Sequence, residues 1–327
     1  MKFGLRLPSF ALGEDTASLA EMGAYLRRAE DLGFESAMLI DHLLVAPPAY
    51  STTWLEPVSL LSALSGVTRT IKLGTLVLVL PFRDPVAFAK EWATLDVLSG
   101  GRSILGVGVG WHEGEFATLR IPFKERGRRM NEMLEAITAL WAGDQVTYEG
   151  QFYRFTDLSL APKPVQRPHP PIWIGGGTQP SEKIYGQHVD TVRPVLRRIA
   201  RYASTWVPHS SATAEMVAAD WTIIQEEMAG FGRDPGEMTK VYSNFIHVLA
   251  PGEAPETAAA KFKVYSGMDL AYWQEFYLLG EAAPLAERIQ GKIEALGGVE
   301  HVILNPLDWS IETLERLASD VLPLVRD

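Results

Sequence analysis

Asp41 and His42 directly follow the apolar run SAMLI, and their side chains can take part in a reaction. An imidazole changes charge near neutral pH, so it can give or take a proton during a reaction. His42 is therefore our candidate catalytic residue, with Asp41 as its companion. The Asp41 carboxylate either orients the imidazole or caps the segment that follows, and the sequence leaves both roles open.

Two glycine-rich stretches form the second candidate feature. In GVGVG (residues 106–110), glycine at every second position removes the side chains from one face of an extended segment. In IGGGT (residues 174–178), a run of glycines follows another apolar run, where backbone N–H groups can bind an anion such as phosphate. By itself the first stretch indicates only close packing of the backbone. Together, the two stretches favour a large flat ligand held by backbone, with its anionic tail on the second stretch.

Other kinds of site are poorly supported. The chain has no cysteine, which excludes disulfides, thiolate metal sites and a cysteine nucleophile. The histidines show no metal-binding spacing and no GxSxG elbow is present, so we expect neither a metal site nor serine hydrolysis. Glu113 and Glu115 follow the first glycine stretch and are expected to be solvated loop charges.

Charge and hydropathy limit the partners. A net charge of −10 gives no basis for binding nucleic acid or an anionic membrane surface. The most apolar run, LVLVLPF at residues 76–82, is too short to cross a bilayer, and the N-terminus lacks the features of a signal peptide. We expect a cytoplasmic protein with no nucleic-acid or membrane partner.

Short β-branched runs alternate with longer amphipathic runs along the 327 residues. Strands are predicted at residues 2–8, 36–41, 72–80, 102–110, 171–177, 203–208, 238–250 and 300–306. Helices are predicted at residues 16–34, 55–68, 84–100, 125–143, 213–230, 281–296 and 310–325. Parallel neighbours need a crossover helix, so this alternation predicts an α/β fold, a single (β/α)8 TIM barrel over residues 1–327. A doubly wound open sheet is the alternative.

Some local features of this barrel are also predicted. Thr16 is the expected N-cap of the first helix, and Gly33 the residue that ends it. Residues 146–155 are expected to form a hairpin that leaves the barrel. Residues 178–194 and 252–280 are two further expected excursions.

Specific motifs add a family resemblance. ATLDVLSGGRSILGVGVGWHEGEF, ERGRRMNEMLEAITALW and LAPKPVQRPHPPIWIGGG resemble the bacterial luciferase-like superfamily of barrel flavoproteins and deazaflavin-dependent oxidoreductases. AEDLGFESAMLIDH and LGTLVLVLPFRDPVAFAKEWATLD extend the resemblance. It runs from Phe3 to about Trp206 with specific motifs, and beyond that mainly as a pattern.

The resemblance implies roles for individual residues. His42 lies beside the reactive ring and transfers a proton, with Asp41 as its neighbour. The pair Leu76-Val77 matches a place where many members have a non-proline cis peptide bond that backs the ring. The residues assigned to the cofactor and its phosphate are Leu76, Val77, Gly108, Val109, Gly110, Gly175, Gly176, Gly177 and Thr178. On this interpretation the bare backbone of residues 106–110 admits a tricyclic ring.

The chain departs from the family pattern after the second glycine stretch. The segment VLRRIARYASTW begins only at Val195, after the insertion TQPSEKIYGQHVDTVRP. This insertion adjoins the expected phosphate site and can supply ligands of its own, such as Lys183 or Arg193. AST also replaces the Asp-Gly that is customary before Trp206.

The resemblance implies three alternative functions. The first, closest in pattern, is hydride transfer between the deazaflavin coenzyme F420 and a small organic substrate. The second is an FMN-dependent monooxygenase that uses reduced FMN and O2 and needs a separate flavin reductase. The third is a catalytically silent flavin-binding protein. Trp54, Phe82 and Trp111, near the expected mouth, either belong to the core or favour an apolar substrate.

The resemblance also implies an assembly. The predicted helical segments at residues 55–68 and 85–98 are apolar over more than one face. We expect a homodimer formed through them.

Overall fold

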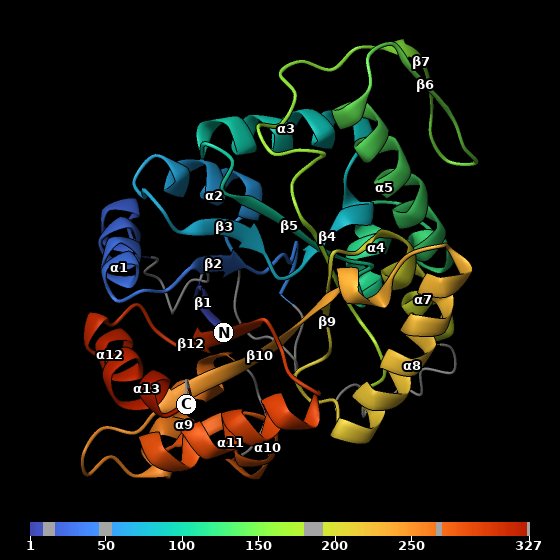
Figure 1. The fold of residues 1–327 in the computed structure, drawn as a ribbon. Coiled ribbons are helices and arrows are strands. Elements are labelled where there is room, and N and C mark those ends of the chain that lie inside the picture. The colour runs from blue at the N-terminus through green and yellow to red at the C-terminus, as the bar shows by residue number, and fades with distance from the viewer. Residues whose placement is uncertain (9–16, 46–53, 180–191, 266–269, 326–327) are drawn as a thin grey trace.

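Parallel strands close into a barrel in the computed structural model, which describes residues 1–8, 17–45, 54–179, 192–265 and 270–325 (Figure 1). The barrel strands are β1 (Lys2–Arg6), β2 (Ser36–Leu39), β3 (Lys72–Thr75) continued by β4 (Leu78–Val79), β5 (Ser103–Gly108), β8 (Ile172–Gly175), β9 (Thr205–Val207), β10 (Thr239–Val248) and β12 (His301–Pro306). Their order is β10-β12-β1-β2-β3-β5-β8-β9, and pairing between β9 and β10 closes the ring. All eight predicted strands are confirmed, and with them the TIM-barrel fold.

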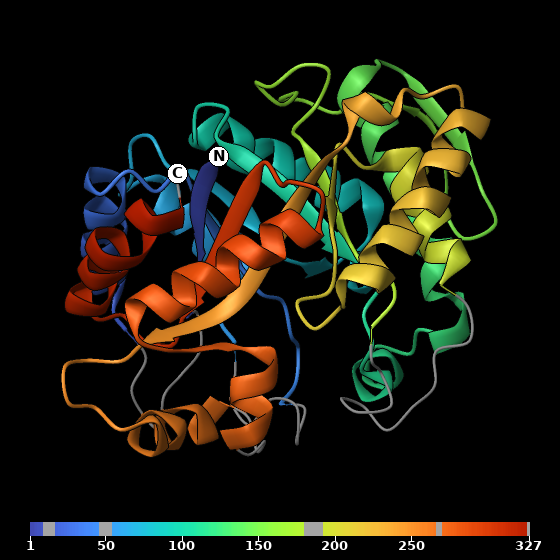
Figure 2. The ribbon, with the colours of Figure 1, turned by 60° about the horizontal axis from the view of Figure 1, so that its bottom comes forward.

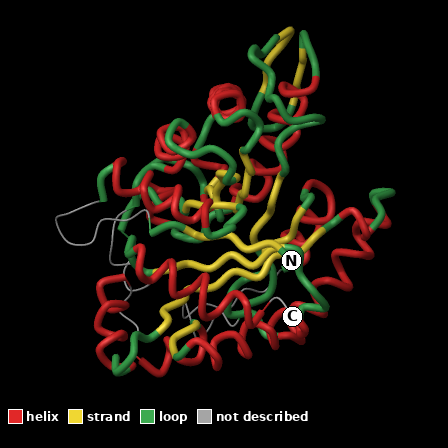
Figure 3. The backbone as a smooth tube through the Cα atoms, turned by 60° about the vertical axis from the view of Figure 1, so that its left-hand side comes forward, coloured by secondary structure: helices red, strands yellow, loops and turns green. Residues whose placement is uncertain are grey.

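Helices surround the barrel, and Figure 3 shows the strands running through the middle of the molecule. The helices are α1 (Leu19–Asp31), α2 (Pro57–Ser65), α3 (Pro85–Leu98), α4 (Glu113–Thr118), α5 (Arg126–Ala142), α7 (Arg193–Tyr202), α8 (Ala214–Gly230), α9 (Pro255–Tyr265), α10 (Leu270–Phe276), α11 (Ala282–Ala295), α12 (Ile311–Arg316) and α13 (Leu322–Val325). None of the helices in the described part of the chain is long and apolar enough to span a membrane.

The first helix begins later than the sequence predicts. Thr16 lies outside the described residues, and the N-cap is Ser18, whose hydroxyl accepts from the Glu21 N–H at 3.2 Å. The Glu21 carboxylate accepts in turn from the Ser18 N–H at 2.7 Å. This reciprocal capping box satisfies two amides at once, and a single cap at Thr16 could not do so. The predicted end is confirmed, because Gly33 follows the C-cap with φ +85°.

The interior of the barrel contains a small apolar cluster. It consists of Met38, Leu76, Ile104, Trp173, Val207, Val241 and Ile303. A much larger core fills the layer between the strands and the helices. Because the strands are covered on both faces, β2, β5 and β12 are buried at every position, as in other parallel sheets.

Of the three expected excursions, the hairpin lies wholly within the described residues, and the one at 252–280 does so except for residues 266–269. The hairpin is confirmed as β6 (Val146–Glu149) paired with β7 (Arg154–Leu158), and it projects from the barrel in Figure 1. The described part of 252–280 contains α9, α10 and β11 (Leu278–Gly280), and β11 pairs with β10. Figure 2 shows α9 and α10 at the carboxyl end of β10. Most of the insertion at 178–194 falls on residues 180–191, outside the described part.

Candidate active site

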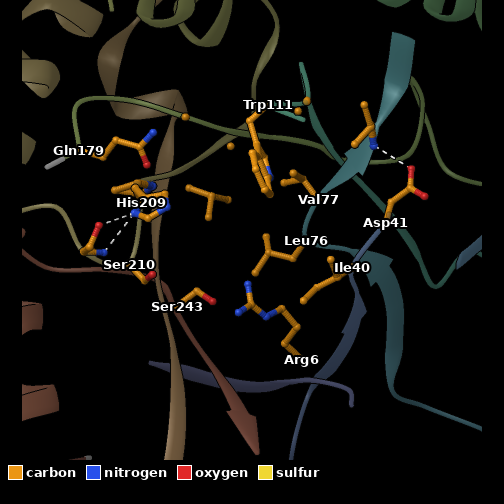
Figure 4. Close-up of a pocket in the computed structure, with 18 of the residues that line it drawn as sticks. Arg6, Ile40, Asp41, Leu76, Val77, Trp111, Gln179, His209, Ser210 and Ser243 are labelled. Atoms are coloured by element: carbon orange, nitrogen blue, oxygen red, sulfur yellow. Dashed lines mark hydrogen bonds between the residues drawn. The ribbon is translucent and has the colours of Figure 1, made fainter. Parts of the chain in front are cut away.

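A cavity of about 280 Å³ lies at the carboxyl ends of the barrel strands (Figure 4). Its wall includes all but two of the residues that the sequence assigns to the site. The predicted residues that line it are Asp41, His42, Leu76, Val77, Gly108, Val109, Gly110, Gly175 and Gly176. Gly177 and Thr178 continue the loop beyond Gly176 without lining the cavity.

His42 is paired with Glu115 of α4. Its Nδ1 lies 3.3 Å from Glu115 Oε1, which also accepts from the N–H groups of Leu43 at 2.6 Å and Leu44 at 3.0 Å. Burial raises the pKa of Glu115, but the hydrogen bonds from His42 and from these amides outweigh it, so the pKa is lowered. An ionised carboxylate only accepts, which assigns the His42 ring proton to Nδ1.

The expectation that Glu115 is a solvated loop charge is wrong. The residue is only 1% exposed, because α4 folds its first turn against the loop that carries His42. The Leu43 and Leu44 amides of that loop need an acceptor, and Glu115 supplies it. Glu113, two residues earlier in the same turn, is exposed, as expected.

Asp41 contacts Arg83 and strand β4. Its Oδ2 accepts from Arg83 Nη1 at 2.6 Å and from the Val79 N–H at 2.9 Å. Burial lowers the pKa of Arg83, but the neighbouring carboxylates of Asp41 and Glu56 raise it by more, so the pKa of Arg83 is raised overall. Asp41 therefore fixes β4 against β2, while Glu115 is the carboxylate that contacts His42.

The peptide bond between Leu76 and Val77 is cis, as the resemblance implied. It lies between β3 and β4, and both residues border the cavity. The Val77 side chain packs between two glycines. A Cβ on Gly108 would lie 2.7 Å from Val77 Cγ2, and a Cβ on Gly175 2.9 Å from Val77 Cγ1.

The bare face of residues 106–110 is therefore filled by protein, and the expectation that it admits a ring is wrong. A Cβ on Gly106 would lie 1.8 Å from the Thr75 carbonyl oxygen. Gly110 has φ +79°, and its Cβ would lie 2.7 Å from Val79 Cγ1. These glycines allow β5 to approach the broken strand β3–β4 closely. Backbone of this stretch still borders the cavity along another side.

The second glycine stretch is held by a residue that the sequence analysis missed. The Thr178 N–H and hydroxyl donate to the Asp220 carboxylate at 2.6 and 2.7 Å, and Asp220 is 3% exposed. The Gly176 N–H donates to the Val207 carbonyl at 3.1 Å. The sequence did contain a signal for Asp220. It lies three residues after Val217, on the buried face of α8.

The two cations suggested as extra phosphate ligands give different outcomes. Lys183 lies outside the described residues. Arg193, at the start of α7, donates to Glu227 at 3.0 Å and is exposed. The Arg193 guanidinium is therefore engaged with α8.

The aromatic residues expected near the mouth separate into two groups. The rings of Trp54 and Trp111 lie 6.0 and 5.7 Å from the His42 ring. Phe82 instead packs against Phe116 at 4.9 Å. Of these three aromatic residues, the two tryptophans border the candidate catalytic residue.

The other side of the cavity carries polar residues that sequence reasoning did not identify. Arg6 ends β1, His209 follows β9 and Ser243 lies on β10. Burial, and to a lesser degree the charge of Arg6, lowers the pKa of His209 to about 4. Tyr272 and Tyr277 also line the cavity, one from α10 and one from the residue before β11. Within the described ranges no group of three His, Asp or Glu side chains could hold a metal ion.

The luciferase-like monooxygenase family model matches residues 1–300. The chain belongs to that family. The FMNH2-dependent dimethylsulfone monooxygenase of Pseudomonas putida is 28% identical over 305 residues, 83% of this chain and 79% of that protein. The F420-dependent glucose-6-phosphate dehydrogenase of Microbacterium testaceum is 35% identical over 193 residues, 57% of this chain and 54% of that protein.

Solved structures agree on the fold of this luciferase-like chain. The monooxygenase RslO1 from Streptomyces bottropensis has a TM-score of 0.78 at 23% identity, with 99% of each chain covered. An F420-dependent secondary alcohol dehydrogenase has the same TM-score at 18% identity, with 100% of this chain and 99% of the other covered. The family thus includes both kinds of enzyme, and this chain is a luciferase-like oxidoreductase.

Proposed function

We propose that the chain transfers a hydride between coenzyme F420 and a small organic substrate, with His42 as the proton-handling residue. The observation that carries this proposal is the His42–Glu115 pair at the wall of the cavity. Moving a hydride to a carbonyl carbon, or from an alcohol carbon, requires a proton to move at the neighbouring oxygen. A histidine with one nitrogen fixed by a carboxylate is suited to that step.

The cavity fits a flat heteroaromatic group. Its volume of about 280 Å³ is just below the range of about 300–1,000 Å³ for small-molecule sites. Leu76, Val77 and Trp111 give it apolar walls, and Gln179 Oε1 is a buried oxygen with no hydrogen-bond partner in the described part of the chain. When bound, the deazaflavin supplies the carbon that gives or accepts the hydride.

The chain's own residues would then have distinct tasks. Leu76, Val77, Val109 and Gly110, which line the cavity, would hold the ring. The loop of Gly175, Gly176 and Gly177 would bind the phosphate. The N–H of the neighbouring Thr178 already donates to Asp220. With its Nδ1 proton directed to Glu115, His42 exchanges protons with the substrate through Nε2. Trp54 and Trp111, beside His42, exclude water.

A second candidate is an FMN-dependent monooxygenase. It is favoured by how much of the chain the monooxygenase relatives cover. The dimethylsulfone monooxygenase matches 83% of this chain, and a trigonelline monooxygenase from Acinetobacter baylyi matches 80%. The latter is named as an oxygenase component. On this alternative, a separate reductase supplies reduced FMN.

The deciding experiment is a spectroscopic titration of the purified protein with F420 and, separately, with FMN. Tight binding of F420 with substrate-dependent bleaching of its absorbance supports the first proposal. Preferential binding of reduced FMN, with oxygen uptake when a flavin reductase is added, favours the second. Binding of either cofactor without turnover of any alcohol, aldehyde or sulfone would favour a silent binding protein.

We also propose a homodimer that uses α2 and α3. Support comes from the end of α3, where Val97 and Leu98 are 41% and 61% exposed, and from Val165 nearby at 52%. Apolar side chains gathered in this way are typical of an interaction surface. Light scattering at micromolar concentration should give twice the 36.1 kDa chain mass, and a monomer mass would reject the dimer.

A further inference from the structure

Arg6 brings a positive charge into the cavity. It is the last residue of β1 and points into the cavity in Figure 4. Its guanidinium carbon lies 4.5 Å from the centre of the Phe245 ring. The Asn305 amide, oriented so that both of its polar atoms are satisfied, accepts from Arg6 Nε and Nη2 at 3.2 Å each. Among the described residues no Asp or Glu pairs with Arg6.

Two further donors line the same cavity. His209 Nδ1 lies 2.6 Å from the Ser211 hydroxyl and accepts from the Ser211 N–H at 3.2 Å, which places the ring proton on Nε2. The Ser243 hydroxyl is buried and has no hydrogen-bond partner in the described chain. Arg6, His209 and Ser243 all line the cavity, and we refer to them as the Arg6 cluster.

The acidic residue in the cavity wall does not neutralise this cluster. Asp41 is the lining carboxylate among the described residues, and it is engaged by Arg83 and the Val79 N–H. A guanidinium with two neutral donors and no anion is the arrangement that binds an oxyanion through charge-assisted hydrogen bonds.

The position of Arg6 in the barrel identifies which oxyanion. β1 and β8 are separated by four strand steps in either direction around the ring, so they lie opposite each other. The loop after β8 is the proposed phosphate site, and Arg6 is therefore across the barrel from it. A group held by Arg6 belongs to the substrate, beyond the cofactor ring.

We propose that the Arg6 cluster binds a carboxylate or sulfonate of the substrate. This proposal rests on the proposed function, because it assigns the oxyanion to the substrate of that reaction. The oxyanion fixes one end of the molecule on Arg6, Ser243 and His209. The apolar remainder extends past Phe245, Tyr272 and Tyr277, which line the same region.

The test measures binding by calorimetry to the unloaded protein and to the protein loaded with its cofactor. The probes are acetate, benzoate, methanesulfonate and benzenesulfonate, with benzamide as the neutral counterpart of benzoate. We expect benzoate or benzenesulfonate to bind at least about tenfold more tightly than benzamide. Arg6→Met, which keeps the stem over Phe245 and removes the charge, should abolish that preference. Arg6→Lys should retain part of it.

Two controls separate the alternatives. Ser243→Ala, a smaller change, should weaken benzoate several-fold even where Arg6→Met fails to fold. The ratio of FMN to riboflavin affinity should be unchanged by Arg6→Met, since a fall in that ratio would mean that Arg6 holds the cofactor phosphate. Equal binding of charged and neutral probes to the wild type, or no binding of any, overturns the proposal. The measurement on unloaded protein stands even where neither F420 nor FMN binds, which would count against the proposed function alone.

Discussion

Nδ1 of His42 lies 3.3 Å from Oε1 of Glu115, 73 positions later in the chain. The contact joins the loop after β2 to the first turn of α4, across the broken strand β3–β4 that separates them in the barrel. The same oxygen holds the Leu43 and Leu44 amides, so the loop and the imidazole are oriented together. Glu115 is a positioning residue on this view, and His42 the group that meets the substrate.

Replacing His42 by Ala should slow turnover by about 100-fold or more, the lower range for lost acid–base catalysis. The measurement is steady-state kinetics with the cofactor that the titration identifies. Cofactor affinity should change little, because the ring contacts we propose come from other residues, namely Leu76, Val77, Val109 and Gly110. Full turnover by the Ala variant would return His42 to a structural role.

Glu115→Gln should lower kcat by about tenfold to 100-fold and leave KM nearly unchanged. A glutamine amide can donate as well as accept, so it no longer fixes the His42 proton on Nδ1. The Glu115→Gln change should add little when His42→Ala is already present, because both act through the imidazole. Fully multiplicative effects in that double variant would mean that Glu115 acts independently of His42.

Gly110→Ala should destabilise the fold by about 2–4 kcal/mol, from left-handed backbone strain together with overpacking. The added Cβ would lie 2.7 Å from Val79 Cγ1 and 2.9 Å from Phe116. Denaturant unfolding measures this. Gly66→Ala is the matched control, because its Cβ would meet only the Ala63 carbonyl at 3.6 Å, and it should be neutral within about 0.5 kcal/mol. A Gly110→Ala variant as stable as the wild type would contradict the close-packing role.

The sequence predicts the barrel because its signals are local. Hydrophobic runs of strand length, separated by helices, can be recognised without knowing which strands pair. His42 can be identified as a candidate because it stands directly after such a run. Glu115 and Asp220 could not be found in this way. Both are ordinary acidic residues until the closed barrel places an unsatisfied amide beside them. Arg6 acquires its meaning only when β1 faces β8 across the ring.

Stability should fall as the pH is lowered from about 6.5 to about 4, in part through His301. Burial lowers the pKa of His301 to about 4, and its ring packs on Trp173 at 5.0 Å. In that pH window the unfolded chain binds a proton that the folded chain does not, so the unfolding free energy decreases by up to about 3 kcal/mol. Above pH 6.5 this contribution is constant.

His301→Gln should reduce the pH dependence of the unfolding free energy, measured by urea denaturation at intervals between pH 4 and 7.5. The slope carries the prediction, because the substitution can also change the absolute stability. His209, whose pKa is also lowered to about 4, contributes in the same direction and should leave a residual slope. An unchanged slope in the His301 variant would contradict this account.

Asp220→Asn should raise the affinity for FMN relative to riboflavin by several-fold to about tenfold. The Asp220 carboxylate binds the Thr178 N–H and hydroxyl, next to the loop that we assign to the cofactor phosphate. A buried negative charge there repels a phosphate and occupies a donor that the phosphate would use. Asparagine keeps the shape and an acceptor oxygen while it removes the charge. Riboflavin, which has the ring without the phosphate, reports any general change in the cavity and serves as the internal control. A lower ratio in the Asn variant would mean that the Asp220 tether orders the loop for phosphate binding, because the loss of loop order would then outweigh the relief of repulsion.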